Sequence, residues 1–130
     1  MPQVIAVGVG GFIGSCARFG ITKLMSRYLP LFPFGTLLSN ALAGLFIGLI
    51  FGIERQALQL PATAKLFLTT GLLGGLSTFC TFSMDTISFF ENGNYLKAGA
   101  NIVLNVGLSL AFVLIGLLVA KALFHSSAAV

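Results

Sequence analysis

Long stretches without charge are the feature that most limits what this chain of 130 residues can fold into. Three uninterrupted ones cover residues 35–53, 66–84 and 98–120, and a fourth, residues 4–24, is broken only by Arg18 and Lys23. Each is long enough to cross a bilayer core of about 30 Å as a helix. We therefore predict an all-α membrane protein of one domain, residues 1–130, with spans near residues 4–26, 35–53, 65–90 and 97–123.

Composition agrees with this prediction and narrows the possible functions. Only 8% of the residues are charged, against about 25% in soluble proteins, and the short loops leave no room for a nucleotide-binding fold. The net charge of +4 forms no basic patch, so a nucleic-acid partner is not indicated. We expect no enzyme. Cys16 and Cys80 fall in predicted spans, where we expect buried thiols that behave as small apolar residues.

The third predicted span is rich in glycine and hydroxyl residues around residues 71–83. Interrupted backbone is tolerated in a membrane only where it is buried in protein or lines a polar cavity. We predict that the helix breaks in mid-membrane at Gly74–Gly75, around an ion or a small solute. Unwound carbonyls at such a break can coordinate a cation.

Two aromatic residues follow the glycines. Phe79 and Phe82 are three residues apart and so share a helix face, which usually indicates core packing. The edge of an aromatic ring is nevertheless electropositive, so two ring edges beside hydroxyl groups could receive a small anion.

The second span carries a stripe of small residues. Gly44, Gly48 and Gly52 follow Asn40 at intervals of four, a pattern that lets membrane helices approach closely, and we expect it to be a contact face of an oligomer. Asn40 either joins helices through hydrogen bonds or binds a ligand.

A second polar stripe lies on the fourth span. Asn101, Asn105 and Ser109 are spaced by four and lie on one helix face, where they either join helices or form a track for a solute. No acidic residue lies deep in a predicted span, which argues against proton coupling through a carboxylate at the midplane.

The basic residues near the span ends are evenly divided. One side of the membrane carries Arg55, Lys65 and Lys121, and the other carries Lys23, Arg27 and Lys97. Because orientation follows an excess of Lys and Arg in cytoplasmic loops, we predict insertion in both directions. An antiparallel homodimer with its two-fold axis in the membrane plane follows from this prediction.

Three motifs identify the family that the chain resembles. They read GGFIGSCARF at residues 10–19, GTLLSN at residues 35–40 and GGLSTFCTFS at residues 74–83. In this order they resemble the motifs of the Fluc (CrcB-like) fluoride channels, and the resemblance covers essentially the whole chain. It implies a passive, fluoride-selective channel that exports cytoplasmic fluoride through two pores per antiparallel homodimer. It also implies a multi-pass protein of the bacterial plasma (inner) membrane.

The resemblance also assigns roles to single residues. Phe79 and Phe82 match the aromatic box that contacts fluoride, and Arg18 matches an arginine near the aqueous entrance. The main-chain carbonyls of Gly74 and Ser77 map onto a structural Na⁺ at the dimer centre. The full implied fluoride pathway comprises Arg18, Asn40, Phe79, Cys80, Thr81, Phe82, Ser83, Asn101, Asn105 and Ser109.

The chain departs from the family pattern in a few positions. Cys80 stands where serine is common, and a thiol is a weaker hydrogen-bond donor than a hydroxyl, so we expect slower conduction if this side chain contacts the ion. Asp85 replaces a common glutamate, and Asn105 replaces a histidine found in several members.

Two other functions compete with a fluoride channel. A small multidrug-type proton-coupled exporter is also short, four-spanned and dual-topology, but it needs an acidic residue in the first span, and residues 4–24 contain none. The other is a membrane scaffold in which every polar group only joins helices.

Overall fold

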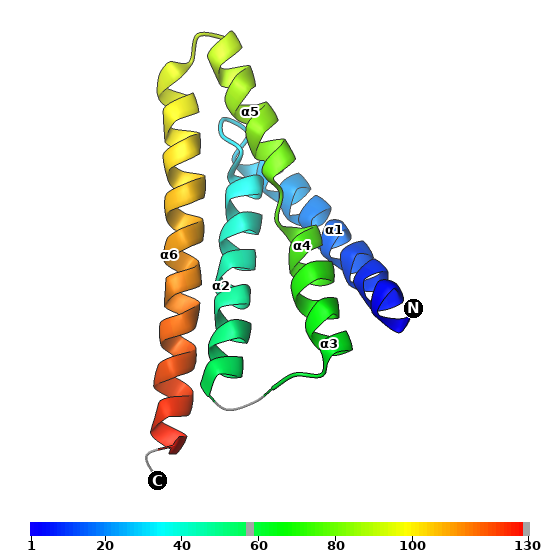
Figure 1. Cartoon of the computed structure of the whole chain (residues 1–130). Helices are drawn as coiled ribbons and strands as arrows, with labels where there is room; N and C mark the ends of the chain where they lie inside the picture. The colour runs from blue at the N-terminus through cyan, green and yellow to red at the C-terminus, as the bar shows by residue number, and fades with distance from the viewer. Residues whose placement is uncertain (57–58, 129–130) are drawn as a thin grey trace.

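The computed structural model describes residues 1–56 and 59–128, which form helices joined by short connections, with no strand among them (Figure 1). Helix α1 covers Pro2–Tyr28, α2 covers Phe34–Gln56 and α6 covers Tyr95–Ala128. The third segment is composite: α3 (Ala62–Leu66), the π-helix η1 (Phe67–Leu73), α4 (Gly74–Leu76) and α5 (Phe79–Glu91). Within the described ranges, four helical segments are long and apolar enough to cross a membrane, namely Pro2–Tyr28, Phe34–Gln56, Ala62–Glu91 and Tyr95–Phe124. The four long apolar helices predicted from the sequence are therefore present.

Proline and glycine mark the ends of these helices. The chain has four prolines. Pro2 stands at the start of α1, Pro30 follows its end, Pro33 precedes α2 and Pro61 precedes α3. Proline lacks an N–H and is tolerated at a helix start but not in its interior. The turn between α5 and α6 contains Gly93 at φ +77°, a conformation that glycine adopts without strain.

Helices α2 and α6 pack along each other through glycine. A Cβ atom built on Gly44 would lie 2.8 Å from the Ser109 carbonyl oxygen, and one on Gly52 would lie 2.5 Å from Ala120 Cβ. Gly48 similarly meets the Val113 carbonyl. The prediction that this stripe is an oligomer contact is therefore wrong, because α6 of the same chain already occupies it.

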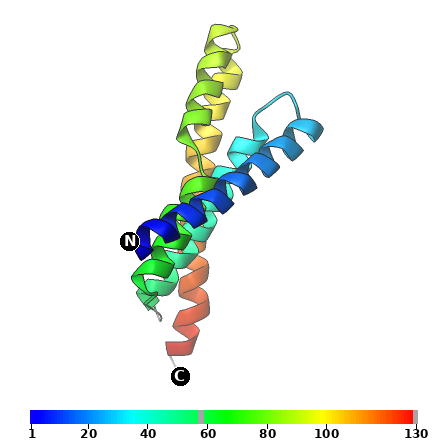
Figure 2. The ribbon, with the colours of Figure 1, turned by 90° about the vertical axis from the view of Figure 1, so that its right-hand side faces the viewer.

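Helix α1 crosses the other helices obliquely and packs on η1 and α4 (Figure 2). Glycines on both sides bring the two backbones into contact. A Cβ atom on Gly10 would lie 2.5 Å from the Phe67 carbonyl oxygen, and one on Gly75 would lie 2.7 Å from the Gly11 carbonyl oxygen. Side chains larger than hydrogen at these positions would separate α1 from the third segment.

The buried apolar core is small and lies where α2 meets η1 and α4. Its main cluster among the described residues is Ala43, Leu73 and Leu76, with partly buried Ile21, Leu42, Ile47 and Ile50 around it. Large apolar side chains are instead exposed along α1 and α6. A surface this apolar suits lipid or another protein surface rather than water.

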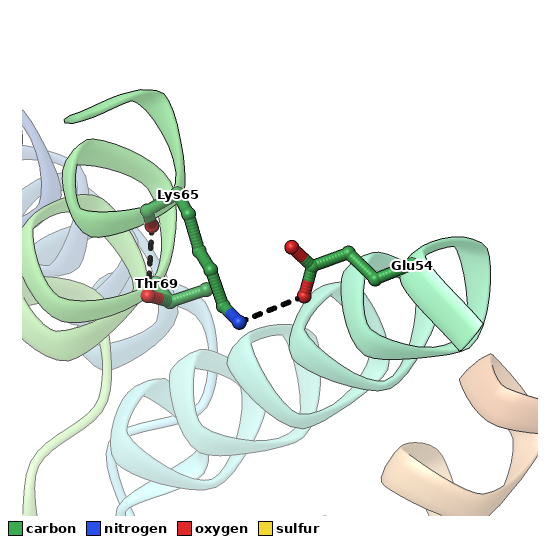
Figure 3. Close-up of polar contacts among 3 residues, drawn as sticks. All are labelled: Glu54, Lys65 and Thr69. Atoms are coloured by element: carbon green, nitrogen blue, oxygen red, sulfur yellow. Dashed lines mark hydrogen bonds and ion pairs between the residues drawn. The ribbon is translucent and has the colours of Figure 1, made fainter. Parts of the chain in front are cut away.

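An ion pair joins the ends of α2 and α3 across the connection between them (Figure 3). Lys65 Nζ lies 2.9 Å from Glu54 Oε2 and 4.9 Å from the centre of the Phe51 ring. One turn later, Thr69 Oγ1 donates to the Lys65 carbonyl at 2.8 Å. Thr69 lies in η1, where the main-chain hydrogen bonds run i→i+5 as in a π-helix. The Thr69 hydroxyl gives the Lys65 carbonyl a hydrogen-bond partner.

Candidate functional site

Two residues in extended conformation separate α4 from α5. Helix α4 ends at Leu76, Ser77 has φ −79° and ψ 152°, and Thr78 has φ −149° and ψ 122°. The predicted position of the break at Gly74–Gly75 is wrong: both glycines belong to α4, with Gly74 at φ −64° and ψ −36°. Gly75 contacts the backbone of α1, so close packing, not unwinding, accounts for it.

Thr78 begins the second half of this segment as the N-cap of α5. Its Oγ1 accepts from the Thr81 N–H at 3.3 Å, as hydroxyl residues commonly do at helix starts. Thr78 is therefore the local sequence signal that a new helix, α5, begins at Phe79. The first amides of α5 have no carbonyl partner within the helix, and they form the positive end of its dipole.

The side chain of Asn40 holds the extended segment. Its Oδ1 accepts the Thr78 N–H at 2.8 Å, and its Nδ2 donates to the Thr78 carbonyl at 3.3 Å. In a continuous helix the Thr78 N–H would bond the Gly74 carbonyl, which is thus left without this donor. Asn40 therefore replaces helical hydrogen bonds at the interruption.

A ladder of side chains continues from Asn40 into α6 and back to α5. Asn40 Nδ2 donates to Asn105 Oδ1 at 3.0 Å, Asn105 Nδ2 donates to Asn101 Oδ1 at 2.8 Å, and Asn101 Nδ2 donates to Thr86 Oγ1 at 2.9 Å. Thr86 Oγ1 in turn donates to the Phe82 carbonyl at 2.8 Å. We call these residues, Asn40, Asn105, Asn101 and Thr86, the amide ladder. Within the single chain their amides join α2, α5 and α6.

The larger hollow at this junction has a volume of about 410 Å³. Five of the ten predicted pathway residues line it, namely Asn40, Phe79, Phe82, Asn105 and Ser109. Gly74 and Ser77, the two residues assigned to a cation, line it as well. The described residues around it include no charged side chain.

The two phenylalanines of this hollow differ in exposure. Their ring centres are 5.4 Å apart and their planes meet at 55°. Phe82 is buried at 7% exposure, whereas Phe79 is 75% exposed. Only Phe82 is therefore a core residue of the single chain.

A second, smaller hollow lies against the same extended segment. It measures about 220 Å³ and is lined by Ser15, Arg18, Phe19, Thr22, Thr36, Thr78 and Thr81. Two further predicted residues, Arg18 and Thr81, thus lie here and not in the larger hollow. Arg18 Nε is buried and has no hydrogen-bond partner among the described residues. Thr78 lines both hollows and so stands between them.

The remaining predicted residues line neither of these hollows. Asn101 is fully buried in the amide ladder, Ser83 is partly buried, and Cys80 is exposed. The expectation of buried thiols is wrong for this chain, because Cys16 and Cys80 are both exposed, free cysteines. Both occur within otherwise apolar helices, where an outward position is as compatible with composition as an inward one.

Sequence reasoning missed Thr86, the buried end of the ladder, and Thr36, which lines the smaller hollow. A signal was available for Thr86: it follows Phe82 by four residues, so its hydroxyl can reach the Phe82 carbonyl within one helix. For a metal, the described residues contain no group of three or more His, Cys, Asp or Glu side chains. The junction offers oxygen donors of other kinds, among them main-chain carbonyls such as that of Gly74 and the hydroxyl of Ser109.

Comparisons with known proteins agree with the motifs. The family described as "CrcB-like protein, Camphor Resistance (CrcB)" matches residues 5–117. A Clostridium perfringens protein is 45% identical over 121 residues, covering 92% of this chain and 94% of its own length. Similar proteins occur in Desulfotalea psychrophila, 43% identical over 87% of this chain and 88% of its own, and in Thermococcus gammatolerans, 39% identical over 92% and 96%. All three bear the name "Fluoride-specific ion channel FluC".

Proposed function

Since the chain belongs to the CrcB-like family, we propose that this multi-pass membrane protein is a fluoride-selective passive channel that lets cytoplasmic fluoride leave down its electrochemical gradient. Relatives named as fluoride-specific channels, aligned along most of both chains, support the ion. The observation that carries the mechanism is the junction at Thr78, where two hollows, each with several polar side chains in its wall, approach one extended backbone segment.

Fluoride holds its water tightly, so a pore must offer dense hydrogen-bond donors in place of the hydration shell. Binding must also be weak enough to allow release. In the smaller hollow, Arg18 and the Thr81 hydroxyl attract the anion. In the larger hollow, the Ser109 hydroxyl and the ring edges of the phenylalanines receive it without a fixed positive charge. Asn40, whose Nδ2 donates to the Thr78 carbonyl and to Asn105, keeps the wall of this hollow in place. The N-terminus of α5, beside Phe79, adds favourable potential between them.

The larger hollow requires a second copy to become a closed path. Phe79 is 75% exposed on the single chain, and in our proposal an antiparallel partner covers this ring. Each dimer then contains two pores, one at each copy of the hollow. The even distribution of Lys and Arg supports the antiparallel arrangement.

A structural Na⁺ at the dimer centre is the second part of this proposal. The Thr78 N–H bonds Asn40 rather than the Gly74 carbonyl, so this carbonyl lacks its helical donor. Ser77 offers a second carbonyl on the extended segment, and both residues line the larger hollow. These residues fit a cation bound by main-chain carbonyls. When bound, Na⁺ would supply positive potential, while the carbonyls of Gly74 and Ser77 from both copies would hold it.

Fluoride efflux from liposomes tests the proposal. Purified protein is reconstituted into vesicles loaded with potassium fluoride, valinomycin balances the charge, and an electrode records released fluoride. We expect rapid efflux with no imposed pH gradient, and no comparable release from vesicles loaded with chloride. Efflux no faster than from protein-free vesicles would refute a channel, and efflux that requires a pH gradient would support a proton-coupled exporter instead.

We place the protein in a bacterial plasma membrane.

A further inference from the structure

We propose that Thr86 is a positioning residue, which anchors the buried end of the amide ladder and so keeps Asn40 oriented toward the extended segment. The inference rests on the proposed function for its readout in fluoride flux, but its geometry stands on the ladder alone. Thr86 is 6% exposed, lines neither hollow at the junction and follows Phe82 by four residues.

The two ends of the ladder cannot exchange roles. At one end, the Thr78 main-chain N–H can only donate, so the group of Asn40 that faces it must be Oδ1. At the other end, the Phe82 carbonyl can only accept, and Thr86 donates its single hydroxyl proton to it. These two constraints agree, with every amide between them pointing the same way.

Thr86 transmits the second constraint to the amides. Having donated to the Phe82 carbonyl, its oxygen can only accept, and it accepts from Asn101 Nδ2 at 2.9 Å. The Oδ1 atom of Asn101 must then face Asn105, whose Nδ2 donates to it at 2.8 Å and to the Asn101 carbonyl at 3.0 Å. The Oδ1 atom of Asn105 is thereby left to accept from Asn40.

Removal of the Thr86 hydroxyl would take away the acceptor of the Asn101 amide. Asn101 is 0% exposed, so water could not replace that acceptor. An unpaired buried donor is unfavourable, so the Asn101 side chain would gain by shifting toward another acceptor. Because Asn101 accepts from Asn105, and Asn105 accepts from Asn40, such a shift would displace both of these side chains. A change at Thr86 thus disturbs Asn40 without touching it.

The experiment compares Thr86→Val, which keeps the shape but lacks the hydroxyl, with Thr86→Ser, which keeps the hydroxyl. Fluoride efflux from liposomes and thermal unfolding in detergent are measured for each. We expect Thr86→Val to reduce efflux by about 3- to 15-fold, the range that one membrane hydrogen bond represents. Thr86→Ser should conduct like the unchanged protein. Thr63→Val, the same change at an exposed residue of the same span, should have no effect. If Thr86→Val does not fold, Thr86→Cys, with its weaker thiol, should show an intermediate loss.

A double variant separates positioning from packing. Asn101→Leu removes the ladder residue that bonds Thr86, so adding Thr86→Val to it should reduce efflux little further. If the two residues acted independently, their effects on efflux would multiply. Unchanged efflux in Thr86→Val, or multiplying losses in the double variant, would overturn the inference. If the unchanged protein conducts no fluoride, the proposed function fails. Thermal unfolding then tests the ladder on its own. The fall in unfolding temperature of the double variant should be smaller than the sum of the falls measured for Thr86→Val and Asn101→Leu. Falls that simply add would overturn the inference.

Discussion

Asn40 bonds both main-chain polar groups of Thr78, accepting its N–H at 2.8 Å and donating to its carbonyl at 3.3 Å. One amide side chain on α2 thus satisfies both groups of an extended residue in an otherwise helical, apolar span. Such pairing is what permits non-helical backbone away from water. The junction is consequently held by a side chain that also lines the larger hollow.

We expect Asn40→Asp to abolish measurable fluoride efflux. The aspartate can still accept the Thr78 N–H, but its second oxygen would face the Thr78 carbonyl and Asn105 Oδ1, two acceptors. Rotation of the Asn105 amide would not help, because its Oδ1 would then face the Asn101 carbonyl and Oδ1. Efflux from liposomes at neutral pH, with dimerisation checked by size-exclusion chromatography, measures the result. A dimer that still conducts would show that the ion path does not depend on Asn40.

Replacement of the two phenylalanines should separate packing from conduction. Phe79→Ile changes a ring that is 75% exposed on the single chain, so it should leave stability almost unaltered, whereas Phe82→Ile changes a core ring at 7% exposure. The latter should lower the free energy of unfolding by about 1.5 kcal/mol or less. Both should sharply reduce fluoride efflux because both remove a positive ring edge. Wild-type efflux from a folded Phe82→Ile protein would remove the aromatic pair from the pathway.

The features of this fold that could be predicted are those determined by residues close together in the sequence. Absence of charge over about 20 residues determines that a segment spans a membrane, so the four long helices could be found from the sequence. Proline likewise marks helix starts, since it lacks an N–H. The position of the interruption could not be found in this way. Gly75 is compatible with both unwinding and close packing, and only the approach of α1 to within contact of its backbone decides between them.

The candidate site was predictable in residue types but not in their partners. The four-residue spacing places Asn101 and Asn105 on one helix face, as the hydrogen bond between them requires. Their connection to Thr86 on α5 depends on how two distant segments pack, which no local pattern specifies. The same holds for Gly48, whose small size predicts a close neighbour without indicating which helix it is.

Two glycines of α6 provide a matched test of the α2–α6 contact. A Cβ atom at Gly116 would collide with the Leu45 carbonyl of α2, whereas one at Gly107 would meet nothing within 4 Å. Gly116→Ala should therefore lower the free energy of unfolding by about 1–3 kcal/mol through overpacking. Gly107→Ala should leave it unchanged or raise it slightly, since alanine favours the helix. Thermal unfolding in detergent measures both; equal stability of the two variants would contradict the packing described.

The last prediction concerns orientation in the membrane. The structure groups the basic residues by end: Lys97 Nζ approaches the Leu31 carbonyl at 3.5 Å in the connection after α1, while Lys65 pairs with Glu54 at the other end. By their places near the helix ends, Lys23 and Arg27 join Lys97 at the first end, and Arg55 and Lys121 join Lys65 at the second. Because Lys and Arg in short loops set orientation whereas acidic residues contribute little, we expect reporters fused to the C-terminus to give signal on both sides of the membrane.

Added charge should convert this mixture into one orientation. Lysine at the exposed positions Asn92 and Asn94, beside Lys97, gives five basic residues against three and should hold that end in the cytoplasm, so that the C-terminal reporter lies outside. Lysine at the exposed positions Ala62 and Thr63 reverses the excess and should place the reporter inside. Glutamine at positions 92 and 94 controls for the substitution itself. If each single-orientation variant is inactive alone but the two conduct fluoride when produced together, the active unit is the antiparallel pair. Full activity of either variant alone would instead show that antiparallel pairing is not needed.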